Sequence, residues 1–355
     1  MKDTLLRNPK LRGARRTWCI STLVLLVAIP LSMFPDRSTA NRASAADYSV
    51  NNARYFQLHD GLADYWMFLK ANRTASSDVR IKSFRDIVIN PHIEAYDSVA
   101  HLWLGDDKNL GRFVEALNGK TPQFRQVDSI FPSRMSAAWA KFQAYAPDLK
   151  PGAPVFLLAA PRIAIGGSVR PLRSQDALIL GSEELSTVIE SQRAFDVLIN
   201  HEMTHLYHQQ VNAEMRRMVA AVYMPPYAPG PTKIYQVLFL EGLAAYTSKR
   251  LNPTAPDSEV LLSDTVASEV KVLWPAIGTD IREHLNSSEK KDVDKYLFDG
   301  QVSQVFPRRA GYYVGMLIAA ELSKKYPFAK LCRMSGVELQ SEVEAALLDL
   351  EKSGI

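Results

Sequence analysis

The segment "INHEMTHLYH", residues 199–208, holds three of the chain's seven histidines and one glutamate. On an α-helix each residue advances by about 100°, so His201 and His205 share one face, a turn apart. Glu202 lies about 100° to the side of His201, where a water molecule on an ion held by the two imidazoles could reach it. This HExxH spacing predicts two zinc ligands and a general base on one helix. The motif alone leaves open a helix whose histidines make ordinary core hydrogen bonds.

A catalytic zinc ion usually takes a third protein ligand and keeps one open position. The segment "KIYQVLFLEGLAAYTSKR", residues 233–250, is apolar on nearly every side of the expected helix, which predicts a buried helix. Glu241 lies in its middle with no basic residue three or four positions away. A bare carboxylate is costly to bury, and a divalent cation would compensate its charge. Glu241 is therefore the expected third ligand, and an ion pair with a distant arginine or lysine is the alternative.

His208 is the rival ligand, because it lies on the same helical stripe as His201. It is two turns along the helix, roughly 10 Å from His201, and three ligands strung along one straight helix cannot close a tetrahedron. The long metzincin motif also fails, since it needs glycine at position 208 and histidine where Val211 stands. We expect His208 to pack beside the site or to contact its ligands.

With "HEMTH" and "EGLAAY" in place, the sequence resembles the gluzincins, the HExxH metallopeptidases whose third ligand is a glutamate on a following helix. More narrowly, it resembles a poorly characterised family of predicted zinc-dependent proteases with HExxH, EGLA and GYxxG motifs. The last motif is "AGYYVG" here, residues 310–315, and the resemblance covers about residues 150–350. It implies one Zn²⁺ per chain, held by His201, His205 and Glu241, with Glu202 as the base.

The resemblance also implies a tyrosine that hydrogen-bonds the oxyanion during peptide hydrolysis. Tyr312 occupies the family's G-Y position, Tyr313 is the neighbouring alternative, and a core aromatic is the structural alternative for either. The segment "RIAIGGSV", residues 162–169, matches the region where such enzymes present an edge strand to an extended peptide. The G-x-M-E-N type segment of aminopeptidases is absent, so amino-terminal trimming is not implied.

The expected activity is zinc-dependent peptide hydrolysis, with a peptide or protein as substrate. Zinc lowers the pKa of a water to ~7, and Glu202 takes its proton and passes it to the leaving amine. Two other interpretations stay open: a zinc hydrolase of a non-peptide substrate, and a catalytically silent zincin-fold binding protein.

The elements that must position these residues fall into two stretches. Residues 46–150 show helical spacing throughout, with breaks expected at Asn118-Gly119 and Pro132. Three short apolar segments then predict strands, at residues 154–160, 162–169 and 176–182. Within the second segment, Gly166-Gly167 lacks the partners of a phosphate loop and indicates a bend or a close backbone approach. Helical patterns resume near residue 194. We expect an α+β chain, in which a zincin-like catalytic domain at 151–350 follows a helical region at 46–150.

Residues 1–45 have the pattern of a secretory signal. A basic stretch ends at Arg16, an apolar run covers residues 18–34, and small residues follow, with cleavage expected after Ala40 or Ala45. An uncleaved membrane anchor at 18–34 is the alternative. An exported protein of the bacterial periplasm, or a secreted one, is therefore expected.

The charge balance predicts no nucleic-acid partner. The first 45 residues carry a net charge of +6. Because the whole chain carries +4, residues 46–355 carry a net charge of −2. The only cysteine beyond the leader is Cys332, so no internal disulfide is expected there.

Overall fold

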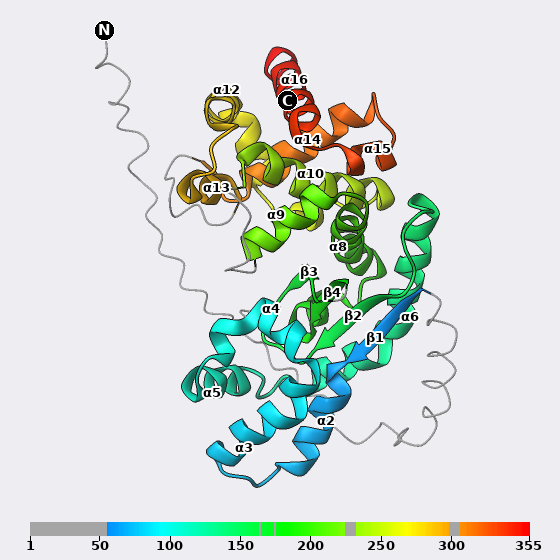
Figure 1. Cartoon of the computed structure of the whole chain (residues 1–355), viewed down its shortest axis with the longest axis vertical. Helices are drawn as coiled ribbons and strands as arrows, with labels where there is room; N and C mark the ends of the chain where they lie inside the picture. The colour runs from blue at the N-terminus through cyan, green and yellow to red at the C-terminus, as the bar shows by residue number, and fades with distance from the viewer. Residues whose placement is uncertain (1–54, 163–164, 174, 224–231, 298–305) are drawn as a thin grey trace, which may run out of the picture. The chain divides into compact units, whose positions relative to one another are not determined.

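A computed structural model of the chain describes residues 55–162, 165–173, 175–223, 232–297 and 306–355 (Figure 1). The described part has a mixed α+β architecture, largely helical, with one small sheet. It falls within one compact unit, residues 46–355. The expected leader, residues 1–45, lies outside the described residues. Among the described helices, none has the length and apolar character needed to cross a bilayer.

The sheet has four strands in the order β1-β2-β4-β3. Their bounds are β1 (Phe56–Asp60), β2 (Ala153–Leu158), β3 (Gly167–Pro171) and β4 (Asp176–Gly181). β1 and β4 run parallel to β2 on its two sides, and β3 runs antiparallel to β4 at the edge. Every residue of β2 and β4 is buried, which explains why both strands are continuous apolar runs rather than alternating ones.

Strand β1 corrects the expectation that helical structure begins near residue 55. Residues Phe56–Asp60 pair with Ala153–Leu157 across almost one hundred positions of sequence, and such a pairing leaves no trace in the local spacing. Asp60 then caps the following helix α2 (Gly61–Ala71) by accepting hydrogen bonds from the backbone N–H groups of Leu62 and Ala63. The turn from strand to helix is thus made by one carboxylate.

The rest of the N-terminal part is helical, as expected. Its elements are α3 (Ser77–Phe84), the π-helix η2 (Arg85–Ile89), the 3₁₀ turn η3 (Asn90–His92), α4 (Ile93–Leu104), α5 (Asp107–Ala116) and α6 (Thr121–Tyr145). The expected break at Gly119 is present, with a left-handed φ of +78° between α5 and α6. The expected break at Pro132 is wrong, because Pro132 lies inside α6. Buried Phe131 and Met135 on either side hold the helix to the core across the lost hydrogen bond.

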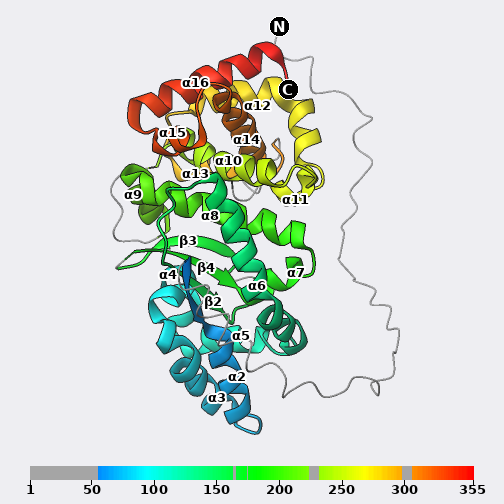
Figure 2. The ribbon, with the colours of Figure 1, turned by 90° about the vertical axis from the view of Figure 1, so that its right-hand side faces the viewer.

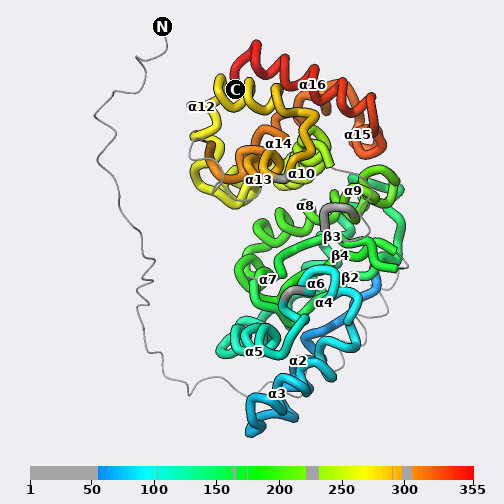
Figure 3. The backbone as a smooth tube through the Cα atoms, turned by 60° about the vertical axis from the view of Figure 1, so that its left-hand side comes forward, coloured from blue at the N-terminus to red at the C-terminus, as the bar shows by residue number. Residues whose placement is uncertain are grey.

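The remaining helices follow the sheet in sequence. They are α7 (Ser182–Val188), α8 (Gln192–Val211), α9 (Ala213–Tyr223), α10 (Ile234–Leu251), α11 (Asp257–Leu261), α12 (Val266–His284), α13 (Lys290–Leu297), α14 (Ala310–Ser323), α15 (Phe328–Arg333) and α16 (Gly336–Ser353). Helix α8 packs against β3 and β4, while α2 packs against β2. Figure 2 shows α8 above the sheet and α2, α3 and α5 below it. Figure 3 shows α10, α12, α14 and α16 beyond α8, on the side away from the sheet.

Helices α10 and α14 make a backbone-to-backbone crossing through two glycines. A Cβ atom added to Gly242 would lie 2.1 Å from the carbonyl carbon of Gly315, and one added to Gly315 would lie 2.1 Å from the carbonyl oxygen of Leu238. No other residue fits at either position without separating the helices. The crossing holds α10, which carries Glu241, in a set position relative to α14, which carries Tyr312.

Candidate metal centre

Helix α8 presents His201 and His205 on one face, as the spacing predicts. The helix begins after Ser191, whose side-chain oxygen accepts a hydrogen bond from the N–H of Ala194. The two Nε2 atoms lie 3.1 Å apart at the surface of a pocket. Neutral imidazoles cannot both direct Nε2 lone pairs at one point unless a proton or a cation lies between them. The pair is therefore suited to hold a metal ion.

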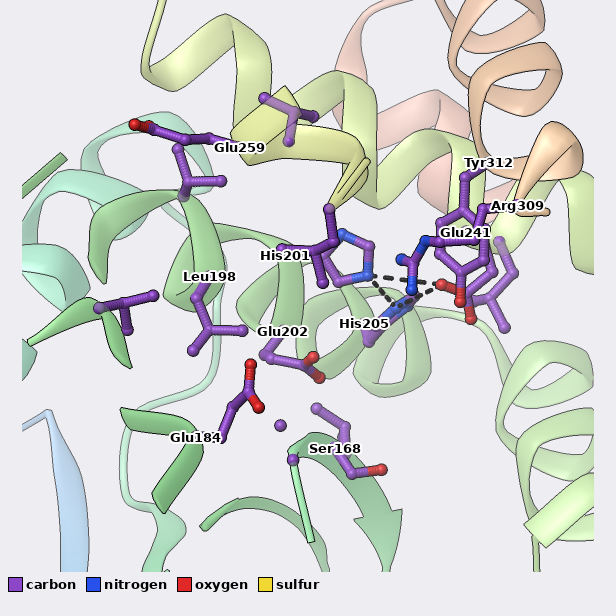
Figure 4. A pocket seen from close by; sticks show the side chains of 18 of the residues that line it. Ser168, Glu184, Leu198, His201, Glu202, His205, Glu241, Glu259, Arg309 and Tyr312 are labelled. Atoms are coloured by element: carbon purple, nitrogen blue, oxygen red, sulfur yellow. Dashed lines mark hydrogen bonds and ion pairs between the residues drawn. The ribbon is translucent and has the colours of Figure 1, made fainter. Parts of the chain in front are cut away.

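Glu241 reaches the same point from helix α10. Its Oε2 atom lies 3.4 Å from Nε2 of His201 and 3.6 Å from Nε2 of His205. A buried hydrogen bond of 2.6 Å, from the Ser248 hydroxyl to the carbonyl of Val197, ties α10 to α8. Figure 4 shows the three side chains turned toward one another.

The three ligand atoms fit a tetrahedral ion. Metal–ligand bonds of about 2.0–2.1 Å place neighbouring ligand atoms of a tetrahedral zinc about 3.3 Å apart. The observed separations of 3.1, 3.4 and 3.6 Å bracket that value. Among the described residues, His201, His205 and Glu241 make up the one group of three or more His, Cys, Asp or Glu residues with ligand atoms this close. The triad could therefore hold a metal ion and leave a fourth position toward the pocket.

The electrostatics of the triad favour a charged carboxylate facing the imidazoles. Burial would raise the pKa of Glu241, but the facing His205 and His201 outweigh burial and hold that pKa far below its ordinary value. Burial would likewise lower the pKa of His205, but the Glu241 carboxylate outweighs it and raises the pKa of His205. The buried Glu241 carboxylate thus stabilises positive charge at His205.

Glu202 lies outside the triad but in the same pocket. Burial raises the pKa of Glu202, and the nearby Glu241 adds to the effect, whereas His201, His205 and Arg170 oppose it. The Glu202 side chain lies directly over Gly167 of β3, where a Cβ atom would approach its Oε1 atom to 2.8 Å. A close approach was expected at Gly166-Gly167, and the structure has one at Gly167. The group that approaches the Gly167 backbone is the side chain of Glu202, the glutamate of the HExxH motif.

His208 does not join the triad. Its side chain is fully buried, and neither ring nitrogen has a hydrogen-bond partner among the described residues. Its ring packs edge-on against Phe239 at a centroid distance of 5.9 Å. Burial and then the charge of His205 lower the pKa of His208 to about 3. It is a buried core residue of α8 that lies outside the group of candidate ligands.

The pocket has a volume of about 390 Å³ and extends along α8 and β3. Backbone and side chains of Gly166–Arg170 line one wall, and Leu198, Val188 and Val260 form an apolar part. Tyr312 lines the pocket, with its ring stacked on His201 at a centroid distance of 6.4 Å. Tyr313 is buried and is not part of the lining. Of the two tyrosines that the motif leaves open, the fold brings Tyr312 to the candidate metal centre.

Several polar residues of the pocket lie outside the sequence motifs, among them Arg309, Arg170 and Gln209. Arg309 has a left-handed φ of +63° just before α14, and its guanidinium carbon lies 4.1 Å from the Tyr312 ring centre. Arg170 projects from β3, and its charge acts on both Glu202 and His205. Gln209 is buried one turn beyond His205, and its amide atoms have no hydrogen-bond partner among the described residues. Of these three, only Gln209 could have been predicted from the sequence, because it lies four residues after His205 on the same face of α8.

Comparison with known proteins found no relative of this chain. No family model matches the chain, and neither the curated proteins nor the solved structures give a match. Function is therefore inferred from the residues of the pocket and their arrangement.

Proposed function

We propose that the protein is a zinc-dependent peptidase of the gluzincin type, with His201, His205 and Glu241 as metal ligands. The observation that carries the proposal is the placement of Glu202. The Glu202 carboxylate lies in the same pocket as a donor set that fits a tetrahedral ion, without being part of that set. The pocket thus combines three ligands, an open position and a candidate base, which together are what metal-assisted hydrolysis requires.

Two further features support a zincin-like fold and a peptide substrate. Strand β3 is an edge strand, which pairs with β4 alone among the described strands, and its residues line the pocket. An extended peptide can add to such an edge through main-chain hydrogen bonds, which would bring its carbonyl groups past the triad. A non-peptide substrate would make no use of that edge.

The reaction follows from the positions of the side chains. A zinc ion held by His201, His205 and Glu241 would supply a Lewis acid that polarises a carbonyl and lowers the pKa of a water to about 7. Glu202 takes a proton from the attacking water and later delivers it to the leaving amine. Tyr312, on the other side of His201, donates a hydrogen bond to the oxyanion. We also propose that the protein is exported, because residues 1–45 have the pattern of a secretory signal.

A cleavage assay with an unfolded protein substrate tests the proposal. The full-length chain should cleave denatured casein, lose activity with 1,10-phenanthroline and regain it on addition of Zn²⁺. Glu202→Gln should keep stoichiometric zinc and lose activity by about 10²- to 10⁴-fold, because it removes the proton acceptor alone. A contaminating peptidase would act equally in both preparations. Zinc-loaded protein that cleaves esters but no peptide would favour the non-peptide hydrolase, and zinc binding without any turnover would favour the silent binding protein.

A further inference from the structure

A second pocket, of about 500 Å³, lies in the N-terminal helical part and is distinct from the metal centre. Helices α2, α3 and α6 and the turn after α2 contribute its lining. Figure 1 shows α2 and α3 at the bottom of the view. Four cationic side chains line it, and no carboxylate does. The cations are Lys70, Arg73, Arg80 and Arg125. Among the described residues, none of the four forms an ion pair with an acidic residue, whereas Arg85, Lys120 and Lys141 each pair with one.

Two of these cations are held in place rather than free in solvent. The guanidinium carbon of Arg125 lies 4.9 Å from the ring centre of Trp66. The indole N–H of Trp66 donates a 2.9 Å hydrogen bond to Asp128, which fixes the ring under Arg125. Arg80 lies 6.0 Å from the Phe68 ring and donates a 3.3 Å hydrogen bond to the side chain of Asn118. Such contacts reduce the side-chain entropy that the arginines would lose on binding a ligand.

Helix stability does not account for the cluster. Lys70 lies in the last turn of α2, where the helix dipole favours a cation. Arg80 lies in the middle of α3 and Arg125 one turn into α6, so neither gains from a helix carboxyl end. Four like charges around one concave surface repel each other, and that repulsion lowers stability unless an anion compensates it.

We propose that this basic pocket binds a multiply charged phosphate or sulfate group. Arginine donates in a planar fork that matches the oxygens of such groups, and two arginines and a lysine can contact one polyanion from different sides. The group would come either from a soluble polyphosphate or phosphate ester, or from an anionic lipid headgroup. The inference is independent of the peptidase proposal, because no residue of the metal centre takes part in it.

Calorimetric titration of the full-length protein with sodium tripolyphosphate tests the site at about 0.15 M ionic strength, where unspecific surface attraction is screened. Saturable binding is expected in the unaltered protein. Arg80→Gln/Arg125→Gln should weaken it by at least about tenfold, as expected for the loss of charge-assisted hydrogen bonds. The control Lys108→Gln/Lys271→Gln removes the same charge at two exposed positions outside both pockets and should leave binding unchanged.

Two further arms complete the experiment. Lys70→Gln/Arg73→Gln alters two exposed side chains only, so it should weaken binding even if the arginine variant were to fold poorly. Flotation with phosphatidylcholine vesicles containing phosphatidylglycerol identifies the source. A loss of flotation in the pocket variants beyond that in the control variant assigns a lipid headgroup, and tripolyphosphate binding without that difference assigns a soluble ligand. Equal effects of the pocket and control variants on both probes, or no saturable binding of either probe, would overturn the proposal.

Discussion

Gly167 of the edge strand β3 lies in contact with the side chain of Glu202 on α8. A Cβ atom at position 167 would come within 2.8 Å of Oε1 and 3.0 Å of Cγ and Cδ of that glutamate. The absence of a side chain at one position of the strand therefore makes room for the carboxylate that the proposed mechanism uses as its base.

Gly167→Ala should consequently displace Glu202 while leaving the metal ligands in place. A shift of about an ångström in a reacting group can lower the rate by about 100-fold, so we expect kcat to fall by about 10- to 100-fold with unchanged zinc content. The matched control is Gly166→Ala, since a Cβ atom at 166 meets nothing within 4 Å. Equal kcat values for the two variants would refute the role of this contact.

Glu241→Ala should release the metal. The substitution leaves two imidazoles and removes the carboxylate that faces them, and even loss of a residue behind a ligand lowers metal affinity by about 10- to 100-fold. Elemental analysis after dialysis should show about one zinc per unaltered chain and little in the variant. Glu184→Ala serves as the control, because Glu184 is also a buried pocket glutamate but pairs with Arg162. Stoichiometric zinc retained by Glu241→Ala would disprove the third ligand.

Tyr312→Phe should lower kcat with little effect on KM or zinc content. The phenylalanine keeps the ring stacked on His201 and removes only the hydroxyl, and loss of one oxyanion donor typically costs about 10²–10³ in kcat. Tyr313→Phe provides the comparison, because Tyr313 is buried outside the pocket lining and should retain kcat. If Tyr313→Phe were the slower enzyme, the assignment within the "GYYVG" motif would have to be reversed.

Gly315→Ala should destabilise the fold through the α10–α14 crossing. The added Cβ atom would lie 2.1 Å from the carbonyl oxygen of Leu238 and 2.9 Å from Cα of Gly242, so the helix backbones must separate. We expect a loss of at least about 2 kcal/mol in the free energy of unfolding, from the midpoint of urea denaturation. Gly105→Ala, whose Cβ atom would meet only the His101 carbonyl at 3.6 Å, should change that midpoint little. Because Glu241 adjoins Gly242, weaker zinc binding should accompany the loss in Gly315→Ala.

Local spacing was enough to predict those features of the candidate site that lie within single helices. The helix period places His201 and His205 on one face, and the apolar surroundings of Glu241 indicate a buried carboxylate in need of a cation. Each of these predictions uses residues of a single helix, α8 or α10, in which the relative position of side chains follows from their spacing in the sequence. The positions of β2, β4 and α8 could be predicted for the same reason, since each is a continuous local pattern.

Which distant segments of the chain meet depends on how the folded chain packs. Strand β1 forms because residues 56–60 pair with a strand almost one hundred positions away, and Arg309 and Arg170 reach the pocket from different elements. The choice of Tyr312 over Tyr313, and the contact between Gly167 and Glu202, likewise depend on how helices and strand edges pack. Burial, backbone contact and the clustering of charge are properties of pairs distant in sequence, and a spacing pattern within one element carries no information about them.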